Sequence, residues 1–108
     1  MEAFEVTTLL EEHARSSKLY LEFLRVLSLS LGVYRLPAGV VEPQNPHAED
    51  EVYYVVDGKA LIRVGTEDRS VGAGSIVYVA ANVPHRFHTI EEDLTVLVFF
   101  SPAEYSRA

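Results

Sequence analysis

The chain has 108 residues, of which 48% are hydrophobic, and its 9 basic and 16 acidic residues give a formal net charge of −7. A chain of this length forms one domain, residues 1–108, and buries roughly 65% of the surface that its unfolded form exposes. The acidic balance argues against a nucleic-acid partner, because phosphate contacts need clustered Lys and Arg. No cysteine is present, so disulfides and thiolate metal sites are excluded.

Neither a membrane span nor a secretory signal is predicted. The N-terminus has no basic stretch followed by an apolar run. The longest apolar segment, residues 19–36, is interrupted by Glu22, Arg25 and Arg35, and charges at these positions argue against a helix in a bilayer. We therefore expect a cytoplasmic protein without a membrane partner.

The N-terminal segment, residues 1–18, is predicted to be partly helical, with Thr7 or Thr8 as the N-cap. The apolar residues at helical spacing are Val6, Leu9 and Leu10. From residue 19 the apolar period changes to two, which is typical of strands. The alternating residues are Leu19, Leu21 and Phe23, followed by Leu27, Leu29, Leu31 and Val33.

Turn signals divide the rest of the chain into short strands. After a turn at residues 37–39, the dipeptide Asp57-Gly58 predicts a tight hairpin, because both central residues of a type I′ turn need positive φ. The strands of this hairpin are predicted at residues 52–56 and 59–64. Further turns are predicted at residues 65–68, 72–74, 82–84 and 91–93, with strands at residues 75–80, 85–90 and 94–100. This regular spacing indicates an all-β sandwich or barrel over residues 19–101.

Two histidines and one glutamate form a candidate metal site. His47 and Glu51 are four residues apart, so both can point to one face of an extended segment, and His85 directly follows a proline. Two neutral imidazoles and one carboxylate suit a first-row divalent ion such as Fe, Mn, Ni or Zn. Such a ligand set leaves coordination positions free, which is typical of a catalytic or ligand-binding site.

The sequence leaves the orientation of this segment open. Glu49 also lies an even number of residues from His47 and Glu51, although Glu49-Asp50 reads as a solvated turn. In a second arrangement Glu51 faces solvent, and Val52, Tyr54 and Val56 face the core instead. A Glu51 turned inward needs a partner, since an unpaired buried carboxylate costs several kcal/mol.

Certain glycine, histidine, glutamate and proline positions recur at defined spacings, at Gly39, His47, Glu51, Gly58, Gly74, Pro84 and His85. Their spacing resembles the two motifs of the cupin family, G-x5-H-x-H-x3or4-E-x6-G and G-x5-P-x-G-x2-H-x3-N. The resemblance covers residues 27–100. It implies a double-stranded β-helix, the small jelly-roll barrel, with a metal held by His47, Glu51 and His85.

Four positions depart from these motifs, namely Asn45 in place of the first histidine, Ala80 and Asn82 in place of proline and glycine, and Thr89 in place of the closing asparagine. The resemblance then implies that Asn45 or Gln44 fills the fourth ligand position or that no protein ligand does. A neutral amide oxygen is a weak ligand for these metals, so metal retention should be weakened. Asn82 is a mild change, because asparagine tolerates the left-handed conformation.

Other polar and aromatic residues receive lesser roles. His88, three residues after His85, is expected on the opposite face of its strand. Tyr53 and Phe87 are expected as pocket walls, and His13 is given no role. The apolar strand residues exceed what one small barrel interior needs, which predicts a homodimer. They are Leu27, Leu29, Leu31 and Val33, with Leu94, Val96, Val98, Phe99 and Phe100.

Two functions remain open. The first is a small-molecule metalloenzyme, a metal-dependent oxygenase or isomerase, in which the ion acts as a Lewis acid or binds dioxygen, as the resemblance implies. The second is a non-catalytic module that binds or senses a small ligand. A fold with many uses does not decide between them.

Overall fold

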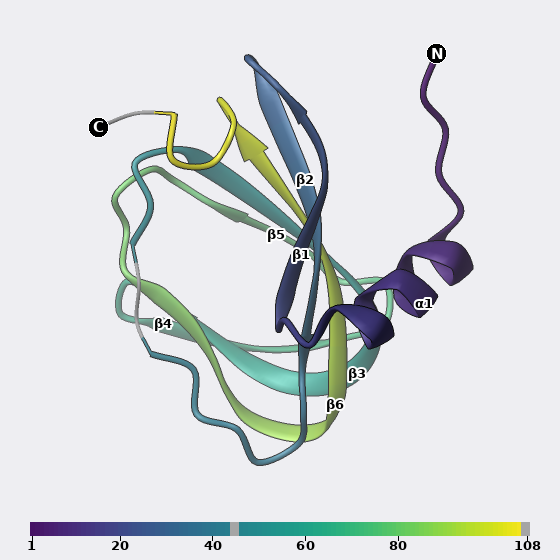
Figure 1. Ribbon diagram of the computed structural model, residues 1–108. Helices are drawn as coiled ribbons and strands as arrows, with labels where there is room; N and C mark the ends of the chain where they lie inside the picture. Colours follow the sequence, from purple (N-terminus) through teal and green to yellow (C-terminus); the bar gives the residue numbers. More distant parts are fainter. Residues whose placement is uncertain (44–45, 107–108) are drawn as a thin grey trace.

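The computed structural model describes residues 1–43 and 46–106. Its elements are α1 Val6–Ser16, β1 Tyr20–Val26, β2 Leu29–Leu36, β3 Asp50–Val64, β4 Glu67–Gly72, β5 Ile76–Val79 and β6 His85–Ser101. All the strand pairs are antiparallel. The strand order is β1-β2-β6-β3-β4, with β5 added to β3. β3 and β6 curve together around the molecule (Figure 1). The prediction of an all-β barrel after one short N-terminal helix is confirmed.

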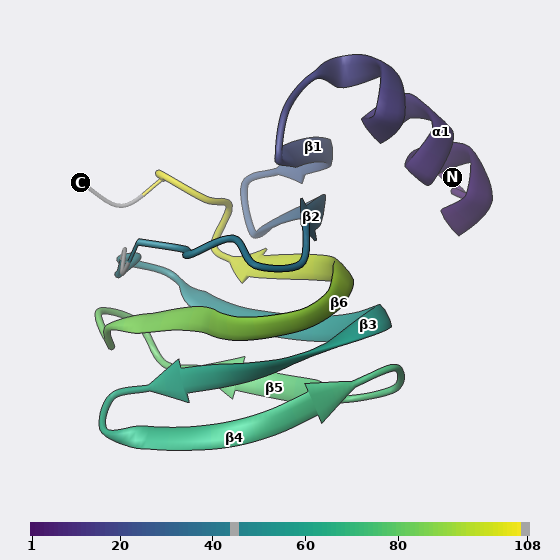
Figure 2. The ribbon, with the colours of Figure 1, turned by 90° about the horizontal axis from the view of Figure 1, so that it is seen from below.

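Helix α1 packs on the outer side of β1 and β2, away from β4 and β5 (Figure 2). Its buried residues are Leu9 and His13, which are four apart and so share one face. His13 Nε2 donates to the Leu19 carbonyl at 2.7 Å, which ties the helix to the start of β1. The predicted threonine cap is wrong, because Glu5 is the N-cap and no side chain caps the helix. The helix in the described part of the chain is too short to cross a bilayer.

The predicted Asp57-Gly58 hairpin is wrong, because this dipeptide lies inside the continuous strand β3. Gly58 has φ +102, and a Cβ there would stand 2.3 Å from the Asp93 carbonyl oxygen of β6. The register between β3 and β6 shifts on both sides of Gly58. A glycine in a bulge can take the positive φ that a type I′ turn also requires, so local sequence signals do not separate the two.

The predicted turn at residues 91–93 is also wrong, because this acidic segment lies within the continuous strand β6. Other turns are confirmed. Gly65 and Thr66 connect β3 to β4, and residues 73–74 precede β5. Asn82 adopts φ 67 in the turn before β6, as expected of an asparagine in a glycine position.

The core fills the interior between the curved halves of β3 and β6. It comprises Leu36, Tyr53, Val55, Ala60, Ile62, Val71, Val79, Phe87, Ile90, Leu94, Val96, Val98 and Phe100. The strands thus alternate between an apolar inner face and a more polar outer face. One end of the inner face of β3 is polar, and this end carries the candidate site.

Candidate metal centre

The first candidate ligand, Glu51, faces the interior of the barrel. It lies between Val79 of β5 and Phe100 of β6 and is 3% exposed. The residues of the same face, Tyr53 and Val55, are also buried. The opposite arrangement is excluded because Tyr54 on the other face is 38% exposed.

His85, the first residue of β6, is held in a defined orientation. Its Nδ1–H donates to the Val83 carbonyl at 2.9 Å. This hydrogen bond leaves Nε2 as the free nitrogen, and Nε2 lies 2.9 Å from Glu51 Oε1. This distance makes the two groups an ion pair when the imidazole is protonated, and both are buried.

His47 precedes β3 and completes the cluster. Its carbonyl accepts from the Asn82 N–H at 2.6 Å, which ties it to the turn before His85. Its ring packs edge-on against Phe100 at 4.9 Å between centroids. One ligand atom from each of His47, Glu51 and His85 lies within 4.8 Å of the other two. The structure therefore brings together the three residues that the sequence singled out, whereas Asn45 and Gln44 lie outside the described residues.

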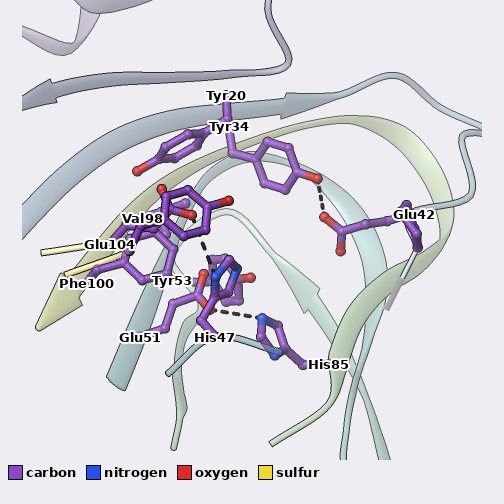
Figure 3. Close-up of a pocket in the computed structure, with 12 residues that line it drawn as sticks. Tyr20, Tyr34, Glu42, His47, Glu51, Tyr53, His85, Val98, Phe100 and Glu104 are labelled. Carbon is purple, nitrogen blue, oxygen red and sulfur yellow. Dashed lines mark hydrogen bonds and ion pairs between the residues drawn. The ribbon is translucent and has the colours of Figure 1, made fainter. Parts of the chain in front are cut away.

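The three residues converge on a cavity of about 250 Å³. Figure 3 shows Tyr20 and Tyr34 on the side of this cavity away from His47, Glu51 and His85. The cavity is lined by Tyr20, Tyr34, Glu42, Pro43, His47, Glu51, Tyr53, His85, Val98, Phe100, Glu104 and Tyr105. Sequence reasoning missed most of this wall, because β1, β2 and the C-terminal segment carry no motif that links them to the cluster.

The cavity wall contains acidic residues that the sequence analysis did not predict, and Glu42 is one of them. Its Oε1 accepts the Phe87 N–H at 2.8 Å, and its Oε2 accepts the Tyr34 hydroxyl. Burial raises the pKa of Glu42 against the opposing effect of these two hydrogen bonds. Burial, followed by the contact with Glu42, raises the pKa of Tyr34 above its ordinary value.

Glu104 enters the cavity from the segment that follows β6. Its N–H donates to Ser30 Oγ at 2.8 Å, and its carbonyl accepts from Arg25 Nη2 at 2.7 Å. Its carboxylate Oε2 lies 3.7 Å from His47 Nδ1. Burial and the neighbouring charge of Glu51 raise the pKa of Glu104 to about 7. Two backbone tethers thus fix the position of this carboxyl group.

The prediction that Glu49-Asp50 forms a solvated turn is wrong, since Asp50 begins β3. Glu49 is 2% exposed, and its Oε1 accepts the Tyr105 N–H at 3.2 Å. Glu49 therefore anchors the C-terminal segment next to the cavity. No sequence pattern around Glu49 indicated this, because its partner is distant in the chain.

The two histidines differ in electrostatic environment. Burial lowers the pKa of His47, which favours the neutral imidazole that binds metals. Burial alone would also lower the pKa of His85, but the contact with Glu51 and the hydrogen bond to Val83 outweigh it and raise the pKa of His85. In the absence of an ion, His85 and Glu51 therefore form a pair that favours the protonated imidazole.

Of three remaining sequence predictions, those for His88 and Tyr53 are confirmed and that for Phe87 is wrong. His88 lies away from the cavity with Nε2 2.7 Å from Asp68 Oδ1, as predicted from its position opposite His85. Tyr53 lines the cavity, as predicted. Phe87 does not: it is fully buried behind the wall, with its ring 4.9 Å from that of Tyr53.

Comparison with known proteins identifies the family to which this chain is related. A family described as "Cupin domain" matches residues 32–100. An uncharacterised protein of Streptomyces coelicolor is 53% identical over 96% of this chain and 99% of its own length. The dimethylsulfoniopropionate lyase DddQ of Ruegeria pomeroyi is 30% identical over 68% of this chain, which spans 37% of that enzyme.

Solved structures show the same fold. An RmlC-like cupin of Methanocaldococcus jannaschii, described as having a double-stranded β-helix fold, gives a TM-score of 0.68. It is 21% identical in sequence, with 82% of this chain and 84% of that chain covered. The motif resemblance, the family match and the common fold agree. The chain therefore belongs to the cupin domain family.

Proposed function

We propose that the protein is a metal-dependent enzyme that acts on a small molecule with an oxygen donor. The observation that carries this proposal is the convergence of His47, Glu51 and His85 on one cavity. A cavity of about 250 Å³ accommodates a ligand of a few heavy atoms rather than a polymer. The cavity walls include both apolar and polar side chains, as is usual for small-molecule sites.

The three residues fit a first-row divalent ion. His85 Nε2 and Glu51 Oε1 lie 2.9 Å apart, a separation that two ligands of one ion would have. The His85 Nδ1–H is already used by a backbone carbonyl, which is the usual outer support of a metal-binding histidine. A bound ion would supply Lewis acidity toward a substrate oxygen.

The protein side chains would orient the substrate and exclude water. Glu42 fixes the Tyr34 hydroxyl and Phe87 stands behind Tyr53, so the walls are held by buried contacts. Phe100 and Val98 provide the apolar part of the wall. We therefore expect substrate specificity to reside in Tyr20, Tyr34 and the carboxyl groups beside them.

A non-redox reaction is our first choice of chemistry. The relative with a named activity at 30% identity is a lyase, although this chain spans only 37% of that enzyme. Dioxygenase chemistry is the competing possibility with the same ligand set. Oxygen uptake with candidate substrates would favour the dioxygenase, whereas turnover under anaerobic conditions would support the non-redox reaction.

The test is elemental analysis of untagged protein purified without chelators. We expect near-stoichiometric transition metal in the wild type and a loss in His47→Ala and His85→Ala. His88→Ala is the matched control, because this histidine lies outside the cavity and contacts Asp68. An unchanged fold of each variant would be checked by circular dichroism. Absence of metal from the wild type, even after soaking with Fe, Mn, Ni and Zn, would contradict the proposal.

The second candidate is a non-catalytic module that binds or senses a small ligand. It is favoured by Asn45, which stands where the first motif has a histidine. Such a module should be stabilised thermally by a metabolite that it does not convert. Loss of turnover in a folded His85→Ala protein would instead support the enzyme.

We also propose that the protein forms a homodimer. β1 is an edge strand of the sheet, and it and the following turn expose Val26 and Leu27 at 46% and 94%. Unpaired strand edges with apolar side chains favour association. Sedimentation at micromolar concentration should give the mass of two chains, and a single-chain mass would exclude the dimer.

A further inference from the structure

The carboxylate of Glu104 lies next to the candidate metal cluster without belonging to it. Its Oε2 is 3.7 Å from His47 Nδ1, and the residue is 8% exposed. Figure 3 shows His47 between Glu104 and the pair formed by Glu51 and His85. In the part of the chain that the structure describes, the group of mutually close ligand atoms consists of His47, Glu51 and His85 alone. Glu104 therefore contacts a candidate ligand from outside the cluster.

The two histidines have corresponding surroundings. His85 donates its Nδ1–H to the Val83 carbonyl, and its Nε2 faces Glu51. His47 directs its Nδ1 toward Glu104, and its Nε2 makes no hydrogen bond or ion pair within residues 1–43 and 46–106. A metal-binding histidine usually donates its second N–H to a carboxylate or a carbonyl, which sets the tautomer and the ring orientation. Glu104 occupies this place for His47, as Val83 does for His85.

His47 needs such a partner because its other contacts do not select a ring nitrogen. The residue precedes β3 and lies outside the strands. Its carbonyl accepts the Asn82 N–H at 2.6 Å, and its ring packs edge-on against Phe100. These contacts hold the main chain and the plane of the ring. The contact of Nδ1 with Glu104 distinguishes one ring nitrogen from the other.

The main chain holds Glu104 in place independently of its carboxylate. The Glu104 N–H donates to Ser30 Oγ at 2.8 Å, and the Glu104 carbonyl accepts from Arg25 Nη2 at 2.7 Å. Ser30 is fully buried, at 0% exposed. Because neither hydrogen bond uses the Glu104 side chain, a substitution at this position can remove the carboxylate without releasing the segment.

We propose that Glu104 is a positioning residue of the metal site. Its carboxylate accepts the Nδ1–H of His47 and thereby directs Nε2 of His47 toward the ion. The separation of 3.7 Å has to close by roughly 0.5 to 1 Å to reach the length of an N–H···O hydrogen bond. This inference rests on the proposed function, because it assigns a residue to the retention of the same ion.

The motif position at Asn45 increases the importance of this role. The cupin motif has a histidine where this chain has Asn45, so the chain lacks one imidazole of the motif. With fewer strong ligands, retention of the ion depends more on the orientation of each remaining one. An outer carboxylate on His47 supports the ligand nearest in sequence to the missing histidine.

The first test is the zinc affinity at pH 8.5, measured by competition with a chromophoric chelator. Glu104→Ala should raise the Kd for zinc about tenfold or more, as the loss of an outer partner of a metal-binding histidine does. Glu104→Gln keeps an oxygen acceptor without the charge and should give a smaller increase. The matched control is Glu91→Gln, because Glu91 is exposed and pairs with Lys59 outside the cavity. An unchanged Kd in Glu104→Ala would overturn the inference.

Two further readouts separate positioning from a structural role. Glu104→Gln should weaken zinc binding without lowering the free energy of unfolding of chelator-treated protein, because the main-chain hydrogen bonds at this position remain. A matching loss of stability in the metal-free chain would contradict positioning. Nitrogen-15 spectra of the imidazoles in zinc-loaded wild type should show His47 protonated at Nδ1 and ligated through Nε2. Ligation through Nδ1 would also overturn the inference.

Ser30 tests the route through the main chain. Ser30→Ala removes the acceptor of the Glu104 N–H but leaves the carboxylate, so it should weaken zinc binding less than Glu104→Ala does. In Ser30→Ala/Glu104→Ala, the serine substitution should add little, because the two residues act through one contact. A full additional loss from Ser30→Ala in the double variant would show that Glu104 does not carry its effect and would contradict the inference.

Failure of the metal proposal can be recognised separately. Wild type that binds no zinc would reject the metal site and this role of Glu104 together. Zinc that binds the wild type, is lost in His47→Ala and His85→Ala, and is retained unchanged in Glu104→Ala would keep the proposed function and reject this inference alone.

Discussion

At the scale of single residues, the cavity brings Glu42 and Glu104 close to Glu51, whose charge helps to raise the pKa of both. Burial raises the pKa of Glu104 to about 7, and the charges of Glu51 and Glu22 add to it. The unfolded chain releases this proton near pH 4.5. Between these two values the folded protein binds more protons than the unfolded protein, so stability decreases as the pH rises.

Glu104→Gln should therefore stabilise metal-free protein at neutral pH. The gain should be absent below pH ~4.5, develop between pH ~4.5 and ~7, and reach roughly 1 to 3 kcal/mol above that range. Urea unfolding of chelator-treated wild type and variant across this range measures it. A gain that is constant with pH would show that Glu104 titrates alike in the folded and unfolded chains.

The carboxyl group of Glu42 should stabilise the folded protein, because its two oxygens each accept a hydrogen bond. Glu42→Ala removes the acceptor of the Phe87 N–H and of the Tyr34 hydroxyl. An unsatisfied buried donor costs about 1 to 3 kcal/mol, so we expect a loss of this order in the free energy of unfolding. Chemical denaturation measures the loss, and the exposed Glu92→Ala should change it by less than about 0.5 kcal/mol.

At the scale of elements, the long strands β3 and β6 determine the shape of the barrel. Both pass from one half of the sheet to the other without interruption, and Gly58 lies where their register shifts. The close approach of the Asp93 carbonyl leaves no room for a side chain. One glycine therefore decides how two strands bend together.

Gly58→Ala should destabilise the protein by at least about 3 kcal/mol, because it adds a steric clash to an unfavourable φ. Gly74→Ala is the matched control, since Gly74 also has positive φ, at +91, but no atom within 4 Å of its Cβ position. This control should cost about 1 to 2 kcal/mol. Urea unfolding compares the two. Equal losses would mean that the backbone conformation alone requires Gly58.

The C-terminal segment is the second element that shapes the site. It is tied down by Ser30, Arg25 and Glu49, which hold Glu104 and Tyr105 through backbone atoms. Because these contacts are made by the main chain, the two side chains are left free to face the cavity. The segment thus completes a wall that the strands alone would leave open.

At the scale of the whole molecule, a bound metal should couple the loop before β3 to the start of β6. An ion that binds only the folded chain adds about 2.7 kcal/mol at a free concentration of 100 Kd. We therefore expect zinc to raise the melting temperature of chelator-treated wild type and to leave His85→Ala unchanged. Calorimetric melting measures this difference.

The stabilisation should also depend on pH. Metal ligation requires neutral imidazoles, and His85 is the histidine whose pKa is raised, so it should protonate first as the pH falls. The increase in melting temperature should then shrink on acidification below neutral pH. An increase that persists unchanged at pH ~5 would argue that zinc binds outside the histidine cluster.

The sequence by itself indicated the class of fold and the three residues of the candidate metal cluster. Apolar alternation and turn residues indicate strands because their physical causes are local. The three cluster residues were indicated by the cupin motif spacing rather than by a shared strand face, since His47 lies in the bent segment before β3. It also placed Asn82 in a left-handed turn, as the structure shows. The strands and the turn depend only on neighbours along the chain, whereas the convergence of His47, Glu51 and His85 depends on the fold.

Only the tertiary structure decided the bend at Gly58, the inward orientation of Glu51 and the walls of the cavity. The positive φ of Gly58 fits a hairpin or a bulge equally well, and the approach of β6 selects the bulge. Glu42 comes from the connection between β2 and β3 and Glu104 from the segment after β6, and the fold brings both into one cavity with Glu51. Such contacts have no local signature, because long-range strand pairing rather than sequence spacing brings the residues together.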